Sequence, residues 1–130
     1  MKILFYPYWR PANEAVGNLE NFLSGLKLQI KHPDLWALVG RTIKKAKEPG
    51  GLEVLRESEY AGKLRNISEP LWEFRIPPKN RRGGVVRIYF CILKEPSERI
   101  VCLDAEFKKR VESSNQKIGA SQGRYREIME

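Results

Sequence analysis

The sequence predicts an α+β fold: an N-terminal strand and a helical hairpin pack on a mainly antiparallel sheet, a three-stranded meander, and a C-terminal helix follows. Two patterns indicate this fold. Over about the first 50 residues, apolar positions recur every three to four residues, and from residue 71 onward they alternate with polar positions. At 130 residues the chain has the size of one domain. We therefore expect residues 1–130 to form a single domain.

The N-terminal part is expected to contain one strand and two helices. Residues 2–8 predict a short strand. Pro11 suits the first turn of a helix over residues 11–30, and a second helix is expected over residues 35–46, before the breaker at residues 49–51. Because the link between them is short, the helices should form a hairpin. Their apolar stripes are Ala15, Val16, Leu19, Phe22, Leu23, Leu26 and Ile30, and Leu35, Leu38, Val39, Ile43 and Ala46.

Three runs of residues predict the sheet, at positions 71–76, 85–93 and 99–105. Apolar side chains alternate with polar ones in the first run, and the second is rich in β-branched and aromatic residues. A basic loop over residues 79–84 and a turn at residues 95–98 connect the runs. The three strands should therefore form an antiparallel meander.

The expected register sorts the side chains onto two faces. If Lys94 and Arg99 close the turn, the strands pair Leu93 with Ile100, Cys91 with Cys102 and Tyr89 with Asp104. The other face would then present Arg75, Arg87, Tyr89 and Asp104. The face that packs on the helical hairpin would consist of Trp72, Phe74, Ile76, Ile88, Phe90, Ile92, Val101 and Leu103.

Two segments outside the meander are less regular. Residues 52–68 have no clear period, and we expect a connector that brings Lys63 and Arg65 near the sheet edge. A final helix is expected over residues 113–129, although its two glycines weaken it by about 1 kcal/mol each. Its inward side chains would be Ile118, Tyr125, Ile128 and Met129.

Composition excludes several classes of protein. No apolar run is long enough to span a membrane, and the N-terminus lacks the apolar core of a secretory signal, so we expect a cytoplasmic protein. Two cysteines and one histidine cannot supply a zinc site, and no metal or cofactor is expected. Reduced, partly buried thiols are the expected state of Cys91 and Cys102, with a regulatory disulfide as the alternative.

Positive charge is concentrated in the predicted sheet. The formal net charge is +8, and residues 75–110 hold ten Lys and Arg against four Asp and Glu. The first 74 residues are nearly balanced, with 11 basic and nine acidic side chains. Such focusing favours a polyanionic partner, and a nucleic acid is the usual one.

The face with Arg75, Arg87 and Tyr89 is suited to a phosphodiester, because guanidinium groups grip phosphate bidentately and a tyrosine can stack on a base or pass a proton. Lys108, Lys109 and Arg110 directly follow the last strand. In RNA, the 2′-hydroxyl can attack the adjacent phosphorus without a metal if cations stabilise the charge and other groups transfer protons. The alternative is that these are solvated charges on the exposed side of a sheet.

Three motifs resemble the core of RelE/ParE-superfamily toxins, especially their phage-derived, HigB-like branch. They are LWEFRI (71–76), VRIYFCI (86–92) and IVCLDAEFKKR (100–110), which occur in the family's order after a helical hairpin of similar length. The resemblance implies a RelE-like toxin of a type II toxin–antitoxin system. Such toxins are endoribonucleases that cleave mRNA, generally on the ribosome, and are neutralised by a cognate antitoxin protein.

The resemblance also suggests roles for individual residues. Arg75 and Arg87 match the family's strand arginines, and Lys108 and Lys109 match its paired lysines, so these four are the expected catalytic residues. Tyr89 and Arg110, from their face and proximity alone, and Arg81 and Arg82 of the basic loop are expected to bind RNA. Two other functions remain open: a non-catalytic basic regulator of the same fold, and a ParE-like inhibitor of DNA gyrase.

Overall fold

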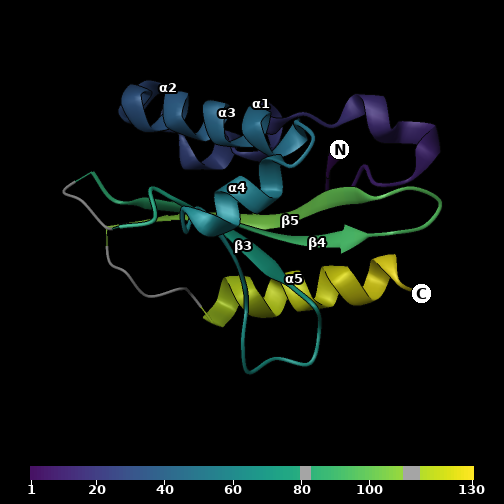
Figure 1. Cartoon of the computed structure of the whole chain (residues 1–130). Helices are drawn as coiled ribbons and strands as arrows, with labels where there is room; N and C mark the ends of the chain where they lie inside the picture. Colours follow the sequence, from purple (N-terminus) through teal and green to yellow (C-terminus); the bar gives the residue numbers. More distant parts are fainter. Residues whose placement is uncertain (80–82, 110–114) are drawn as a thin grey trace.

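A five-stranded sheet forms the centre of this computed structural model, which describes residues 1–79, 83–109 and 115–130 (Figure 1). The strand order is β1-β5-β4-β3-β2; β1 runs parallel to β5, and the other neighbours are antiparallel. The predicted α+β fold and its meander, β3-β4-β5, are confirmed, and one more strand lies at each edge. The strands are β1 (Lys2–Phe5), β2 (Ala61–Lys63), β3 (Trp72–Ile76), β4 (Val85–Leu93) and β5 (Arg99–Lys108).

Helices cover the sheet on both sides. Helices α1 to α4 lie on one side, and α5 (Asn115–Ile128) lies on the other (Figure 1). The second predicted helix is confirmed as α3 (Pro33–Lys47), in which Pro33 occupies the first turn and three lysines the last. The others are α1 (Leu19–Phe22), α2 (Leu28–Lys31) and α4 (Gly51–Glu57), with 3₁₀ segments at Pro11–Val16 and Ser24–Leu26.

The continuous helix expected over residues 11–30 is wrong, because this stretch folds as short helical pieces. Gly17 and Asn18 are extended, and the Asn18 side chain accepts a hydrogen bond from the Asn21 N–H, which starts a new helix. Lys27 has a left-handed backbone conformation (φ 53°) and separates the 3₁₀ segment Ser24–Leu26 from α2. The predicted apolar stripe is confirmed only in its middle, where Leu23 is buried and Leu19, Phe22 and Leu26 pack beside it; Ala15, Val16 and Ile30 are exposed.

The connector expected over residues 52–68 is more ordered than its sequence indicates. It contains most of α4 and the edge strand β2, which pairs with β3. Gly50 is left-handed (φ 72°) just before α4. Lys63 lies exposed at the end of the edge strand, so its expected position near the sheet edge is confirmed.

The predicted register of the last hairpin is wrong by one residue at its turn. Leu93 pairs with Arg99 and Cys91 with Val101, because the turn closes one residue earlier than expected. An irregularity between Tyr89 and Phe90 then absorbs one residue of β5 and restores the predicted pairing of Tyr89 with Asp104.

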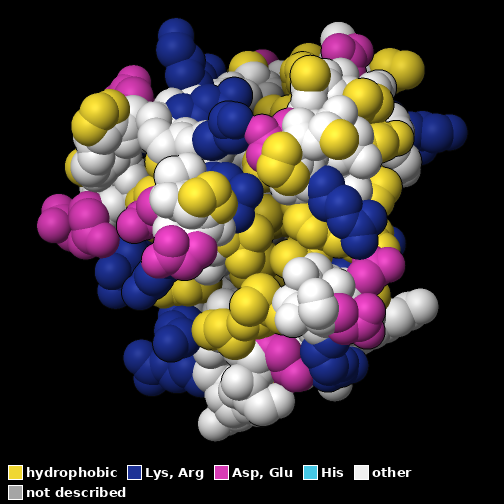
Figure 2. Space-filling model, turned by 90° about the vertical axis from the view of Figure 1, so that its right-hand side faces the viewer, with side chains coloured by type: hydrophobic (Ala, Val, Ile, Leu, Met, Phe, Trp, Pro, Cys, Tyr) yellow, Lys and Arg dark blue, Asp and Glu magenta, His cyan; other side chains and the backbone are white. Residues whose placement is uncertain are grey.

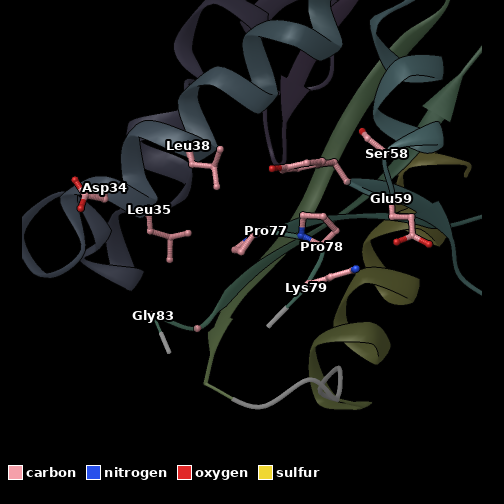
Figure 3. Close-up of a pocket in the computed structure, with 11 residues that line it drawn as sticks. Asp34, Leu35, Leu38, Ser58, Glu59, Pro77, Pro78, Lys79 and Gly83 are labelled. Carbon is pink, nitrogen blue, oxygen red and sulfur yellow. The ribbon is translucent and has the colours of Figure 1, made fainter. Parts of the chain in front are cut away.

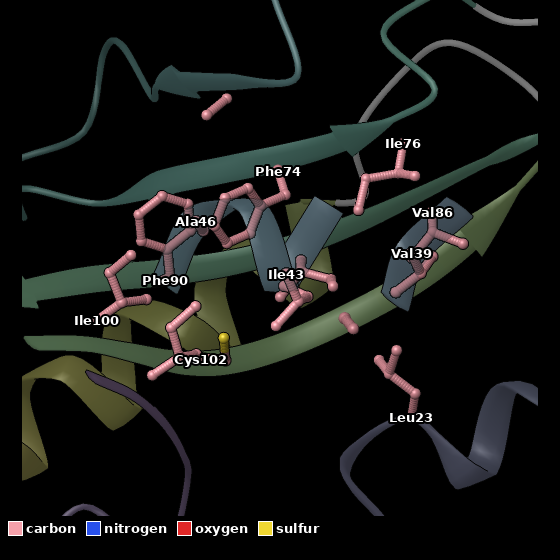
Figure 4. Close-up of a cluster of buried hydrophobic side chains, with 14 of the residues drawn as sticks. Leu23, Val39, Ile43, Ala46, Phe74, Ile76, Val86, Phe90, Ile100 and Cys102 are labelled. Atoms are coloured by element: carbon pink, nitrogen blue, oxygen red, sulfur yellow. The ribbon is translucent and has the colours of Figure 1, made fainter. Parts of the chain in front are cut away.

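This shift changes which side chains of β5 face the helices. Ile100 and Cys102 join the core beneath α3, whereas Val101 and Leu103, expected there, face the α5 side. The larger core is apolar throughout, and Phe74 stacks on Phe90 with ring centroids 4.3 Å apart. Figure 4 shows side chains of the sheet gathered around those of α3 and Leu23, which follows α1: Leu23, Val39, Ile43, Ala46, Phe74, Ile76, Val86, Phe90, Ile100 and Cys102.

A smaller core lies on the α5 side. Tyr125 and Ile128 pack there as expected, but Met129 does not, because it follows the last turn of α5 and is 57% exposed. The buried members are Leu4, Trp9, Leu71, Cys91, Val101 and Leu103. This core occupies only part of the face, and the rest is polar.

Both cysteines are buried free thiols on opposite faces of the sheet. Burial raises the pKa of the Cys91 thiol to about 12 and raises that of Cys102 as well. Both residues are free thiols, as expected, but they are fully and not partly buried, and their expected direct pairing is wrong. Within the described residues, none of the helices has the length and apolar character needed to cross a bilayer.

Candidate functional site

The polar part of the α5-side face is organised around one carboxylate. Arg75 and Arg87 lie directly opposite each other on β3 and β4. Glu73 Oε1 lies 2.8 Å from Arg87 Nη1 and 3.4 Å from Arg75 Nε. A single carboxylate thus holds two guanidinium groups side by side.

A second carboxylate, Glu106 on β5, continues the network. It lies opposite Arg87, and its Oε2 accepts a hydrogen bond of 2.8 Å from the Tyr89 hydroxyl. Its Oε1 is 3.5 Å from Lys108 Nζ. We call Glu73, Arg75, Arg87, Tyr89, Glu106 and Lys108 the ionic cluster.

Burial differs strongly within the ionic cluster. Only 7% of the Arg87 side chain is exposed, and Tyr89 is fully buried. About a third of each of the Arg75 and Lys108 side chains is exposed, 35% and 34%. A charge removed from water needs a partner, which explains why the innermost guanidinium and carboxylate groups are paired.

The local sequence makes room for this arrangement. Gly62 on β2 lies opposite Glu73, and a Cβ there would lie 3.0 Å from Arg75 Nη2. The missing side chain therefore leaves space for the guanidinium group over the edge strand. Gly84 (φ 86°) packs against the Phe107 ring where β4 begins, at the same end of the sheet.

Asp104 connects this face with α5. Its Oδ1 accepts a hydrogen bond from the Ala105 N–H and lies 3.7 Å from both Lys117 Nζ and Arg124 Nη1. Arg124 also donates to the Leu103 carbonyl at 2.5 Å. Asp104 therefore anchors the helix, and its two nearest cations are on α5.

The structure supports only part of the predicted site. Arg75, Arg87 and Lys108 share one face, as expected, but the expectation that Arg87 and Tyr89 stand open on that face is wrong, because both are buried in polar contacts. Lys109 is exposed just after β5. Three predicted RNA-binding residues lie outside the described residues: Arg81, Arg82 and Arg110.

Sequence reasoning missed the two carboxylates that organise the ionic cluster. Glu73 is two positions before Arg75, and Glu106 is two positions before Lys108. Residues two apart on a strand share a face, so this spacing puts both carboxylates beside the cations. That alternation was the available signal that the arginines would be paired.

A cavity of about 660 Å³ lies on the other side of the sheet (Figure 3). Leu35 and Leu38 of α3 face Pro77 and Pro78 across it, and Glu59 lies at its rim. Lys79 and Gly83 also line it. Among the described residues, no group of His, Cys, Asp and Glu side chains could hold a metal ion.

Comparisons with known proteins do not extend these observations. No protein-family model, curated protein or solved structure matches the chain. The resemblance to RelE/ParE-superfamily toxins therefore stays a prediction from the sequence motifs.

Proposed function

We propose that this protein is the toxin of a type II toxin–antitoxin system, a metal-independent endoribonuclease that cleaves mRNA in the cytoplasm in association with the ribosome. The observation that carries the proposal is the register match of Arg75 with Arg87 on neighbouring strands, with Lys108 on the same face. The +8 charge of the chain supports an RNA partner as well.

In this proposal the exposed cations bind the scissile phosphate. The side chains of Arg75 and Lys108 reach solvent, whereas Arg87 is fixed by Glu73 behind them. A preorganised set of cations favours the charge that develops on the phosphorus oxygens when the 2′-oxygen attacks. Arg75 and Lys108 therefore contact the phosphate, and Arg87 contributes positive charge from behind them without touching it.

The reaction also needs two proton transfers. The 2′-hydroxyl loses its proton as its oxygen bonds to phosphorus, and the leaving 5′-oxygen gains one as the P–O5′ bond breaks, which leaves a 2′,3′-cyclic phosphate and a 5′-hydroxyl end. Neither the acceptor nor the donor is assigned to a residue: Glu106, the carboxylate beside Lys108, is only 5% exposed, and its Oε2 already accepts a hydrogen bond from the Tyr89 hydroxyl.

A second candidate function has a specific observation in its favour. Arg87 and Tyr89 are buried, and their contacts with Glu73 and Glu106 suit a structural brace. A non-catalytic basic regulator of the same fold would bind nucleic acid through exposed cations only. A gyrase inhibitor would be toxic without cutting RNA.

Induction in cells separates these functions. The nuclease proposal expects growth arrest with new mRNA 5′ ends, and purified protein should cleave the same sites in the presence of a chelator. Growth arrest without new ends favours gyrase inhibition, and neither effect favours the regulator. The antitoxin is tested by co-expression: if an acidic protein from a neighbouring reading frame is the antitoxin, it should relieve the growth arrest.

Single substitutions test the site itself. Arg75→Gln and Lys108→Gln should each lower cleavage by about 100-fold, within the range for lost electrostatic stabilisation, and should leave the thermal midpoint nearly unchanged. Arg41→Gln and Lys44→Gln on exposed positions of α3 are the matched controls. Cleavage by both site variants at the control rate would overturn the assignment. Arg87→Ala is a poor test, because it would leave the buried Glu73 without its nearest guanidinium group.

A further inference from the structure

We infer that a groove at the other end of the sheet binds an acidic, amphipathic segment of a partner protein. The groove lies between the β4–β5 turn, the loop before the first 3₁₀ segment and the last turn of α5, and its volume is about 590 Å³. It is at the Leu93 end of β4, whereas Arg87 of the ionic cluster is near the start of that strand. This inference goes beyond the proposed nuclease function and does not depend on it.

The floor of the groove is apolar and open to solvent. Figure 2 shows hydrophobic side chains lining a hollow in the centre of this face of the molecule. Ile92, Leu93 and Ile128 are half-buried there, and Met129 is 57% exposed. The smaller core lies directly beneath, so the groove is a continuation of packed apolar structure and not a scatter of single side chains.

The rim of the groove is mainly basic. Its charged lining residues are Arg10, Lys94, Arg99 and Glu95, three cations and one anion. Arg99 is engaged, because it donates to the Glu95 carbonyl at 2.6 Å and lies 3.9 Å from Glu14. Arg10 and Lys94 are exposed and make no salt bridge with any described residue. Their charges are therefore available to a partner.

Charge decides which occupant fits. A second copy of the chain would bring a like-charged rim and another +8 molecule against the groove, which disfavours self-association. RNA would meet mainly aliphatic side chains, because of the two aromatic lining residues Trp9 is already stacked on Tyr6 and lies under the Arg10 guanidinium group, and Tyr125 is half-buried. An amphipathic polypeptide segment with apolar anchors and flanking Asp and Glu matches both floor and rim.

The test uses a fluorescent, designed helical peptide of about 15 residues, with Leu and Trp at positions i, i+3, i+4 and i+7 and Glu elsewhere. We expect it to bind the full-length protein with a Kd in the micromolar range, on the order of 10 μM. A peptide with Lys in place of Glu and a scrambled Glu peptide should both bind at least about tenfold more weakly. Equal binding of the three peptides, or no binding of the Glu peptide, would overturn the inference.

Variants locate the binding site. Met129→Glu should weaken binding of the Glu peptide at least about tenfold, whereas Ile30→Glu, at another solvent-exposed apolar position on α2, should not. Lys94→Glu should weaken it as well and reduce its salt dependence. Unchanged binding by Met129→Glu would place the peptide elsewhere and refute the assignment.

Two further measurements distinguish the other occupants. Sedimentation should show a monomer, and a dimer that Met129→Glu dissociates would replace the partner segment by a second copy. Vesicles with anionic headgroups should not bind in a Met129-dependent manner; if they did, the groove would be a membrane contact instead. Because both native thiols are buried, a single Met129→Cys variant can be labelled there to follow any of these partners.

Discussion

The two faces of the sheet differ although the same strands build both. Phe74, Ile88 and Phe90 belong to an apolar face that is filled by α3 and its neighbours. The opposite face is apolar at one end and holds the ionic cluster at the other. Buried ion pairs add little net stability compared with apolar packing. The comparison therefore indicates that one face carries the stability of the fold and the other carries its chemistry.

The helices that cover the two faces differ in the same way. Helix α3 buries Val39, Thr42, Ile43 and Ala46, whereas Ser121 is the only buried residue of α5. Helix α5 is held largely by polar contacts, including those from Gln122 and Arg126 to Glu69. Polar contacts at a surface contribute less than buried apolar area, so α5 should detach more easily than α3.

Isoleucine truncations on each face would break this comparison most directly. Ile88→Ala removes a fully buried side chain and should cost about 2–5 kcal/mol of unfolding free energy. Ile128 is half-buried on α5, so Ile128→Ala should cost about 1 kcal/mol of unfolding free energy. Ile30 is 85% exposed, and Ile30→Ala should change the unfolding free energy by less than about 0.5 kcal/mol. Urea unfolding measures all three. A cost for Ile128→Ala equal to that for Ile88→Ala would show that the faces contribute alike.

Substitutions in the ionic cluster sharpen the comparison. Glu73→Leu leaves Arg87 buried without its nearest carboxylate and should cost about 3–5 kcal/mol. The double variant Glu73→Leu/Arg87→Met replaces the pair with apolar groups and should recover most of that loss, ending within about 1–2 kcal/mol of the parent. Urea unfolding of the single and double variants gives the coupling. If the loss of unfolding free energy in the double variant equalled the sum of the losses in Glu73→Leu and Arg87→Met, the two side chains would not be energetically coupled.

Much of the fold could be predicted because, in some segments, residue composition, apolar pattern and boundary residues all indicate the same secondary structure. The run at β4 is apolar, β-branched and bounded by turn residues, and α3 combines a proline start with a regular stripe. The stretch over residues 11–30 keeps the helical spacing but contains Gly17 and Asn18, whose preference for breaks and caps prevailed. Spacing alone therefore identified only the middle of the stripe: Leu23 is buried as expected, but Val16 and Ile30 are exposed and Leu28 is buried in place of Ile30.

The site was only partly predictable for a related reason. Alternation along β3 and β4 placed Arg75 and Arg87 on one face, which depends only on residue parity. Whether that face is open depends on α5, whose pattern is weak, and on which carboxylates reach the arginines. Those are tertiary contacts between segments far apart in sequence, such as Tyr89 with Glu106 and Arg124 with Asp104. A single sequence carries little information about them.

The glycines of α5 provide a smaller test. Gly119 and Gly123 are exposed within the helix, and a Cβ at either position would meet no atom within 4 Å. Gly119→Ala and Gly123→Ala should each stabilise the protein by about 0.4–1 kcal/mol, because alanine restricts the unfolded chain and favours the helix. Thermal unfolding measures the gain. A loss of stability would mean that the helix must approach another surface closely at that position.

The smallest expected effect is the dependence of α5 attachment on pH. The pKa of Glu69 lies below its ordinary value, chiefly because the Gln122 side chain donates a hydrogen bond to its carboxylate. A carboxyl group with a lowered pKa in the folded state stabilises the fold above its unfolded pKa, and the contribution is lost as the pH falls through its folded pKa. Glu69→Gln should therefore lower the thermal midpoint slightly near pH 7, and the gap between parent and variant should shrink below about pH 4.

Gln122→Met separates this hydrogen bond from the general acid sensitivity of the protein. It removes the main cause of the lowered pKa while leaving the Arg126 contact with Glu69 Oε2 in place. In the Gln122→Met background, the Glu69→Gln gap should be smaller at neutral pH and should change less with acid, because less differential proton binding remains. A gap that stayed constant from neutral pH to acid in the parent protein would mean that Glu69 does not help to hold α5. The contrast between an apolar and a polar attachment would then have to rest on Arg124 and Asp104 instead.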